Sequence, residues 1–139
     1  MLSAKVSAFT VTGPTGGGYP LTFSTTVFNE GSNFNAGTGK FTCSVPGVYF
    51  FALSLIKRRS SDDSVNDRVV GYIRQNGHNK VSTYIDPNDQ YADYGSYGTS
   101  ATVTLRLQTG DVVDVTGSNS NYMSPHTMFS GFLIQPDEP

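Results

Sequence analysis

The chain has little of several things on which folds and active sites commonly depend. Among its 139 residues there is no tryptophan, one cysteine and two histidines, and only 14% of the residues are charged. The single cysteine, Cys43, cannot form an intrachain disulfide, and its apolar neighbours predict a small buried hydrophobic residue rather than a reactive thiol. The 11 acidic residues outnumber the 9 basic ones, which argues against nucleic acid as a partner.

Long apolar runs and helical patterns are also missing. No apolar run approaches the length of about 18 residues that a membrane-spanning helix needs, so we expect no membrane insertion. The N-terminal stretch MLSAKVSAF is too short and too polar for a secretory signal, which leaves a mature or recombinant form and an intracellular protein as alternatives. No segment keeps a period of about 3.6 residues, so we expect almost no helix.

Residue patterns typical of catalysis are absent as well. His78 follows a tight turn and His126 lies in a polar loop, so both are expected to be solvated. The glycine run 16–18 lacks the Lys and Ser/Thr that bind phosphate, and no Gly-x-Ser-x-Gly or Cys/His ligand spacing occurs. The adjacent carboxylates Asp62 and Asp63 lie in a polar loop, where burial cannot tune their pKa values. We therefore do not expect an enzyme.

Aromatic residues and turn formers alternate between residues 23 and 53, and the rest of the chain is organised around this stretch. The aromatics are Phe23, Phe28, Phe34, Phe41, Tyr49, Phe50 and Phe51. Asparagines, glycines and a Pro-Gly pair separate them. This texture predicts short strands joined by tight turns, with the large rings meeting in one core.

The whole chain reads as one all-β domain, 1–139, with a jelly-roll β-sandwich of about eight to ten antiparallel strands. The expected strands are 5–11, 21–28, 40–45, 48–56, 68–75, 80–85, 99–108, 112–116 and 127–135. Residues 13–20 are too rich in glycine and proline for regular structure. The strand 48–56 is apolar on both faces, so we expect one face to enter the core and the other to contact a partner subunit.

The spacing of this stretch resembles the aromatic signature of the C1q globular-head domain. The matching positions are Phe23, Asn29, Phe34, Phe41, Gly47, Tyr49 and Phe51, while Leu53 stands where that family has an aromatic. The segments GSYGTSATVTLRLQTGD and FSGFL resemble later strands of the same family. The resemblance implies the jelly roll shared with the tumour-necrosis-factor superfold and a homotrimer. Tyr, Phe and Leu side chains on the outer faces of strands 48–56 and 99–108 would form its interface.

Two polar loops carry oxygen ligands of the kind that calcium prefers. Residues 86–93 supply Asp86, Asn88, Asp89 and Asp93, and residues 62–67 supply Asp62, Asp63 and Asp67. Ordinary solvated loops are the alternative. The resemblance implies a bound Ca²⁺ held by Asp86 and Asp93, with the carbonyl of Ala92 as a further ligand.

Exposed tyrosines and arginines are the candidate ligand-binding residues. Tyr91, Tyr94 and Tyr97 recur at every third position among small or polar neighbours, which suits stacking on sugars or contact with proteins. Arginines at three positions could engage anionic glycans: Arg58, Arg59 and Arg68. The alternatives are tyrosines that fill the core or the seam between subunits, and a solvated charge cluster.

Together these features favour a secreted, extracellular recognition module that trimerises and binds glycans or other microbial surface ligands with the help of calcium. Three weak sites on one rigid assembly would gain avidity on a repeated array. The chain has no collagen-like stalk, as in many stand-alone members of the family that the sequence resembles. The first alternative is a trimeric receptor ligand or extracellular scaffold that binds a protein partner. The tip of a microbial surface filament is a third.

Overall fold

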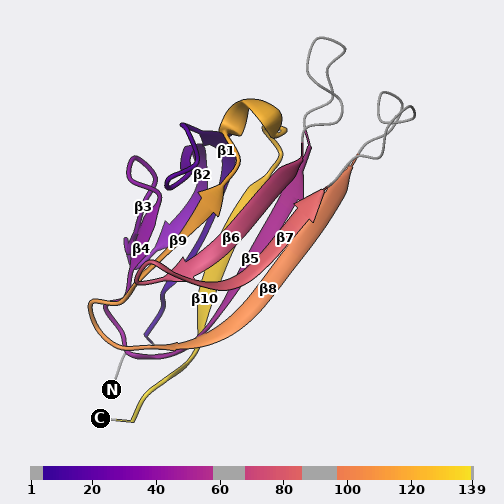
Figure 1. Ribbon diagram of the computed structural model, residues 1–139. Helices are drawn as coiled ribbons and strands as arrows, with labels where there is room; N and C mark the ends of the chain where they lie inside the picture. The colour runs from indigo at the N-terminus through magenta and orange to yellow at the C-terminus, as the bar shows by residue number, and fades with distance from the viewer. Residues whose placement is uncertain (1–4, 58–67, 86–96, 139) are drawn as a thin grey trace.

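The computed structural model describes residues 5–57, 68–85 and 97–138, which form ten strands and a single 3-10 turn (Figure 1). The strands are β1 (Ala8–Thr15), β2 (Thr22–Glu30), β3 (Phe34–Asn35), β4 (Lys40–Thr42), β5 (Gly47–Ile56), β6 (Val69–Gln75), β7 (His78–Ile85), β8 (Gly98–Leu107), β9 (Val112–Gly117) and β10 (Met128–Pro136). The 3-10 turn covers Ser120–Tyr122. The all-β prediction is therefore confirmed.

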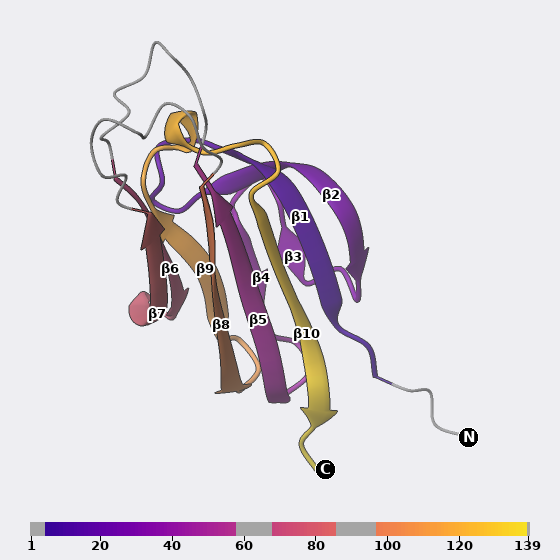
Figure 2. The same ribbon diagram turned by 90° about the vertical axis from the view of Figure 1, so that its right-hand side faces the viewer.

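The strands form two five-stranded antiparallel sheets that pack face to face (Figure 2). Sheet A has the order β2-β1-β10-β5-β8, and sheet B has the order β3-β4-β9-β6-β7. Strands that are far apart in the sequence are neighbours in both sheets, as in a jelly roll. At one side of the sandwich β7 and β8 approach each other, and the hydroxyls of Thr83 and Thr99 lie 2.6 Å apart across the gap.

The pleat of β5 separates its residues into two faces as the sequence predicts. Tyr49, Phe51 and Leu53 are fully buried between the sheets, and the intervening residues are half-buried on the outer face of sheet A. Because side chains alternate along a strand, one ten-residue element supplies both the centre of the core and the middle of an outer surface. The outer surface is one of the candidate sites described below.

Phe9 lies at the centre of the aromatic core. Its ring centroid is 4.4 Å from that of Phe34, 5.4 Å from Phe41 and 5.1 Å from Phe129. These separations and tilts are those of favourable ring pairs. Gly131 faces the same rings, and a Cβ at this position would lie 2.5 Å from the ring of Phe51. The core thus needs a glycine in the closing strand, where any side chain would displace a ring.

Two of the polar or small positions in the aromatic signature have direct structural reasons. The Asn29 side chain donates to the Phe34 carbonyl at 2.8 Å and accepts from the Phe34 amide at 3.3 Å, which fixes the turn between β2 and β3. Gly47 begins β5 beside the end of β10, where a Cβ would lie 2.3 Å from the carbonyl oxygen of Gln135. Besides its aromatic rings, the signature therefore includes Asn29, which fixes a turn by hydrogen bonds, and Gly47, which allows a close contact between two backbone segments.

The prediction of a loop over residues 13–20 is wrong for residues 13–15, because β1 continues to Thr15. Pro14 pairs with Phe23 and Thr15 with Thr22 across the β1–β2 ladder, whereas the β1–β10 ladder has ended at Thr12. Proline is tolerated where a strand is paired on one side only. At its start β1 begins at Ala8, later than the predicted 5, and the two-residue β3 was not predicted.

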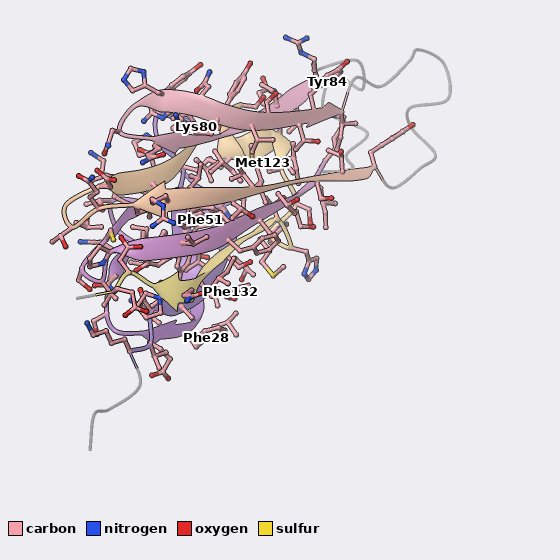
Figure 3. The ribbon with its side chains drawn as sticks, turned by 90° about the horizontal axis from the view of Figure 1, so that it is seen from below. Phe28, Phe51, Lys80, Tyr84, Met123 and Phe132 are labelled. Atoms are coloured by element: carbon pink, nitrogen blue, oxygen red, sulfur yellow. The ribbon has the colours of Figure 1, made fainter. Side chains whose placement is uncertain are left out.

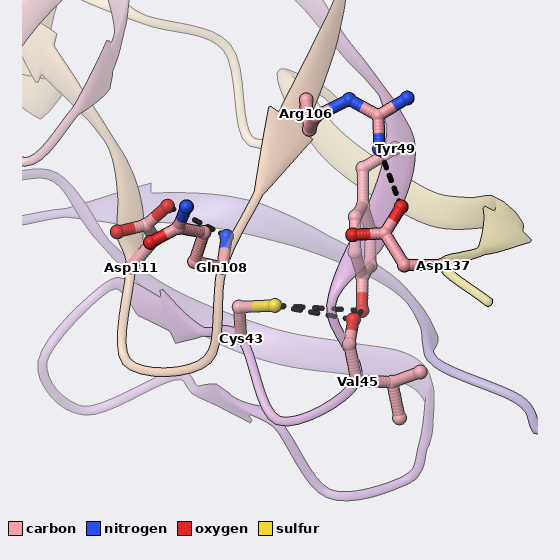
Figure 4. Close-up of polar contacts among 7 residues, drawn as sticks. All are labelled: Cys43, Val45, Tyr49, Arg106, Gln108, Asp111 and Asp137. Carbon is pink, nitrogen blue, oxygen red and sulfur yellow. Dashed lines mark hydrogen bonds and ion pairs between the residues drawn. The ribbon is translucent and has the colours of Figure 1, made fainter. Parts of the chain in front are cut away.

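Cys43 and Tyr49 share a buried polar contact at the end of the sandwich where β5 begins (Figure 4). The Tyr49 hydroxyl donates to the Val45 carbonyl at 2.7 Å, and the Cys43 thiol lies 3.2 Å from the same carbonyl. Burial raises the pKa of the Tyr49 hydroxyl to about 12, and it also raises the pKa of the Cys43 thiol. Cys43 is therefore a buried structural thiol, as its neighbours predict.

Asp111 holds the turn between β8 and β9 at the same end of the molecule (Figure 4). Its carboxylate accepts hydrogen bonds from the backbone N–H of Gln108 at 2.8 Å and from the side-chain amides of Asn76 at 3.1 Å and Gln75 at 3.3 Å. These bonds favour the ionised form, with that from Gln108 foremost, so they lower the pKa of Asp111. The contact ties the β6–β7 hairpin to the β8–β9 turn.

Candidate functional site

The outer face of sheet A carries an apolar patch that the core does not use. Phe50 and Phe132 are directly opposite each other on β5 and β10, with ring centroids 5.4 Å apart. Phe132 is 47% exposed, Ile134 is 52% exposed, and Phe28 on the far strand β2 is 42% exposed. We call these four residues the outer patch. Figure 3 shows Phe28 and Phe132 on the same side of the sandwich.

The surroundings of the outer patch are small or hydroxylated. On β8 the residues that face outward beside β5 are Thr102 and Thr104, and Ala52 lies next to Thr102. The nearest charges of β8 and the C-terminal segment, Arg106 and Asp137, form an ion pair with each other (Figure 4). A surface with exposed aromatics at its centre and charges at its rim has the composition of a protein–protein interface.

The predicted composition of this interface needs one correction. Tyr49 and the leucines of β5 were expected among the contact residues, but they point into the core and are fully buried. The outward residues of β5 are those in the alternate register, with Phe50 at their centre. The pleat of β5 determines which residues face outward, because neighbouring residues of a strand point to opposite faces of the sheet.

A second group of side chains lies on the outer face of sheet B. The Arg68 guanidinium carbon is 5.7 Å from the ring centroid of Tyr84, which is the geometry of a cation–π contact. Tyr84 is 58% exposed. Arg68 is among the predicted ligand-binding residues, whereas Tyr84 is not among the tyrosines predicted to bind. The alternation of Tyr84 with buried Thr83 and Ile85 in the hairpin was the signal that could have placed it outward.

Of the other predicted ligand residues, Tyr97 is the one that lies within the described structure. Tyr97 precedes β8, and its carbonyl accepts the Lys57 amide at 2.9 Å. The remaining predicted residues lie outside the described ranges: Arg58, Arg59, Tyr91 and Tyr94. The same is true of the calcium ligands Asp86, Ala92 and Asp93. In the part of the chain that the structure does describe, no three metal-ligating side chains gather into a cluster. The calcium site stays a prediction.

A polar groove that the sequence patterns did not reveal lies between β2 and the β3–β4 hairpin. It has a volume of about 790 Å³, and its lining includes Asn29, Asn33, Asn35 and Lys40 together with serines and threonines. Phe34 also borders it but is only 5% exposed, so no aromatic face is offered there for stacking. The density of Asn, Ser and Thr between residues 29 and 44 was the available signal.

Comparison with known proteins decides the family. The family model of the C1q domain matches residues 6–134. The chain belongs to the C1q domain family. This membership confirms the resemblance drawn from the aromatic signature, and domains of this family are generally binding modules rather than enzymes. No helix in residues 5–57, 68–85 and 97–138 is long and apolar enough to cross a membrane.

Relatives of this C1q domain are longer proteins. Complement C1q tumor necrosis factor-related protein 2 of Mus musculus is 31% identical over 126 residues, covering 86% of this chain and 39% of the relative. Complement C1q tumor necrosis factor-related protein 7 of Mus musculus is 30% identical over 125 residues, covering 85% of this chain and 39% of the relative. The chain therefore spans well under half of the length of these relatives.

Solved structures confirm the C1q/TNF type of jelly roll. The globular domain of zebrafish complement 1qA protein superposes with a TM-score of 0.70 at 26% identity, covering 94% of this chain and 99% of that one. Murine APRIL gives the same TM-score of 0.70 at 12% identity, covering 94% of this chain and 100% of that one, which shows likeness of fold alone. The sandwich described above is thus the fold of this C1q domain.

Proposed function

We propose that this C1q domain is a secreted, homotrimeric recognition module without catalytic activity. The outer patch on sheet A carries the proposal, because Phe28 on β2 and Phe132 and Ile134 on β10 expose large apolar side chains on strands of one sheet. Domains of the C1q and TNF type typically trimerise, and a three-fold assembly gives such a patch a partner surface. Three copies of any weak binding surface then act together on a repeated target.

The assembly state is the first part to test. Sedimentation equilibrium of the wild-type chain is expected to give three times its 15.0 kDa mass. Phe132→Ser should shift the mass toward that of one chain, since it removes half of the ring pair at the centre of the outer patch. Tyr84→Ser is the matched control, because it removes an exposed aromatic from sheet B. A wild-type chain that sediments as a monomer at concentrations on the order of tens of micromolar would contradict the proposal.

The target is proposed to be a glycan or another repeated microbial surface ligand, with calcium assisting. The test is a pull-down with microbial polysaccharides and whole bacteria, first with calcium and then with a chelator. Binding that chelation abolishes supports calcium-assisted recognition through the predicted loop ligands. Binding that is unchanged by the chelator supports the recognition role but argues against a contribution from calcium. If none of these targets binds, the trimer is better described as a receptor ligand or an extracellular scaffold for a protein partner.

A further inference from the structure

Arg68 and Tyr84 form a preorganised pair on the outer face of sheet B. Tyr84 is directly opposite Val70 in the β6–β7 ladder. Arg68 is two residues before Val70, so Arg68 and Tyr84 are diagonal neighbours on the same face. Diagonal neighbours of this kind are within reach of long and aromatic side chains, and the guanidinium carbon lies 5.7 Å from the ring centroid.

The backbone beside this pair is fixed by Ser118, in the segment that follows β9. The Ser118 hydroxyl accepts the Val70 amide at 3.0 Å and is 3.5 Å from the Arg68 carbonyl, while the Ser118 amide donates to the Val70 carbonyl at 3.0 Å. The segment that follows β9 therefore holds the start of β6 in place. Fixing the backbone reduces the conformational entropy that a ligand would otherwise have to remove from Arg68.

Both members of the pair keep binding capacity. A guanidinium above a ring still presents its N–H edge outward, and within the described residues no carboxylate forms an ion pair with Arg68. Arg74, which lies within β6, is different, because both oxygens of Asp114 accept from it at 2.8 Å. Tyr84 offers its hydroxyl and exposed ring surface beside the Arg68 guanidinium.

We propose that the Arg68–Tyr84 pair binds an anionic saccharide, with a sulfate or carboxylate group on the guanidinium and a sugar ring against the tyrosine. A fork of N–H donors matches a sulfate or carboxylate, and an aromatic face packs on the C–H face of a sugar. The formal net charge of −2 gives no long-range attraction for polyanions, so affinity must come from this local pair. This inference rests on the proposed glycan-binding function and names its ligand class.

The position of the pair suits an assembled protein. Figure 3 shows Tyr84 on the side of the sandwich opposite Phe28 and Phe132. Assembly through the outer patch would therefore leave Arg68 and Tyr84 open on each subunit. A polyanionic chain with repeated sulfate groups could then engage more than one subunit.

The test compares dextran sulfate with uncharged dextran of the same length, using biolayer interferometry on the full chain. The wild-type protein is expected to bind dextran sulfate and not to bind uncharged dextran. Arg68→Ala and Tyr84→Ala should each raise Kd by about tenfold, whereas Tyr84→Phe, which keeps the ring, should stay within about twofold. Lys5→Ala is the matched control: it also removes one exposed positive charge, but from the segment before β1, and should stay within about twofold.

Each of the following results would overturn the inference. Equal losses for Lys5→Ala and Arg68→Ala would show nonspecific attraction of a polyanion, as would Tyr84→Ala binding like wild type. Stronger binding to phosphatidylserine vesicles than to dextran sulfate would assign the pair to a lipid headgroup. Wild-type binding to microbial polysaccharides without any binding to dextran sulfate would reject this site and leave the proposed function standing. Failure to bind any saccharide would reject both.

Discussion

At the scale of single residues, two polar groups at one end of the sandwich, the buried Tyr49 hydroxyl and the partly exposed Asp111 carboxylate, connect the fold to pH. Tyr49 donates its hydroxyl proton to the Val45 carbonyl, and Asp111 accepts three N–H groups. Burial favours the neutral hydroxyl of Tyr49, and the accepted N–H groups favour the ionised carboxylate of Asp111. The two residues therefore contribute to the pH dependence of stability at opposite ends of the pH scale.

Tyr49 predicts a loss of stability in alkali. Its folded pKa is about 12 against an ordinary value of 10.0, so the neutral hydroxyl stabilises the fold fully below pH 10 and progressively less as pH rises toward 12. Tyr49→Phe should cost roughly 1 kcal/mol of unfolding free energy at about pH 8 and flatten the decline above pH 10. Urea unfolding at about pH 8 and about pH 11 measures both effects. Tyr19→Phe, at an exposed tyrosine, is the control that should follow wild type.

Asp111 predicts a loss of stability in acid. Its folded pKa is lowered, so its contribution is complete above the unfolded value near 3.8 and is lost as pH falls through the folded value. Asp111→Ala should lower Tm by about 4 °C at about pH 7, and the difference from wild type should shrink at low pH. Differential scanning calorimetry at about pH 7 and about pH 3 tests this. An equal deficit at both pH values would show that the charge of the carboxylate is irrelevant.

At the scale of strands, most of the architecture was predictable because side-chain alternation and turn residues were clear. The predicted strand 48–56 and its buried face match β5 closely, since large apolar residues recur at alternate positions. The end of β1 was not predictable, because proline favours a loop unless it is known that β1 pairs with only one neighbouring strand at Pro14. Arg68 was found from its charge, but Tyr84 became its partner only through the cross-strand register of the hairpin.

The closing strand β10 predicts a steric effect at Gly131. A Cβ there would lie 2.5 Å from the ring of Phe51 and 2.9 Å from that of Phe9, so Gly131→Ala must displace core rings. We expect a cost of about 2 kcal/mol, measured as a lower urea midpoint with an unchanged slope. Gly17→Ala is the matched control, because no atom lies within 4 Å of its added Cβ. Equal midpoints for the two variants would mean that the core adapts without strain.

At the scale of the whole molecule, the two outer faces are suited to different tasks. Under the proposals above, the apolar face of sheet A serves assembly, and the Arg68–Tyr84 pair on sheet B serves recognition. Because the faces are opposite each other, a substitution on one is expected to leave the other intact. Variants of the outer patch should therefore lose avidity on arrays while each isolated subunit keeps its intrinsic affinity.

Calcium is predicted to act on the assembled protein through Asp86 and Asp93, which lie outside the described residues. Calcium should raise the Tm of wild type, and Asp86→Ala combined with Asp93→Ala should remove that rise without changing the assembled mass. Thermal scans with calcium and with chelator, followed by sedimentation of both proteins, make the measurement. An undiminished rise in the double variant would place the ion elsewhere.

The pairing of β1 with β10 has a mechanical consequence. Ala8, at the start of β1, is opposite Phe132 near the end of β10, so both ends of the chain leave the sandwich beside each other. Tension applied between the two ends would pull these antiparallel neighbours apart from one end and break their hydrogen bonds one pair at a time. Shearing would instead require many bonds to break together. A C1q domain pulled by its ends is thus expected to open at low force, beginning with the strand that carries Phe9.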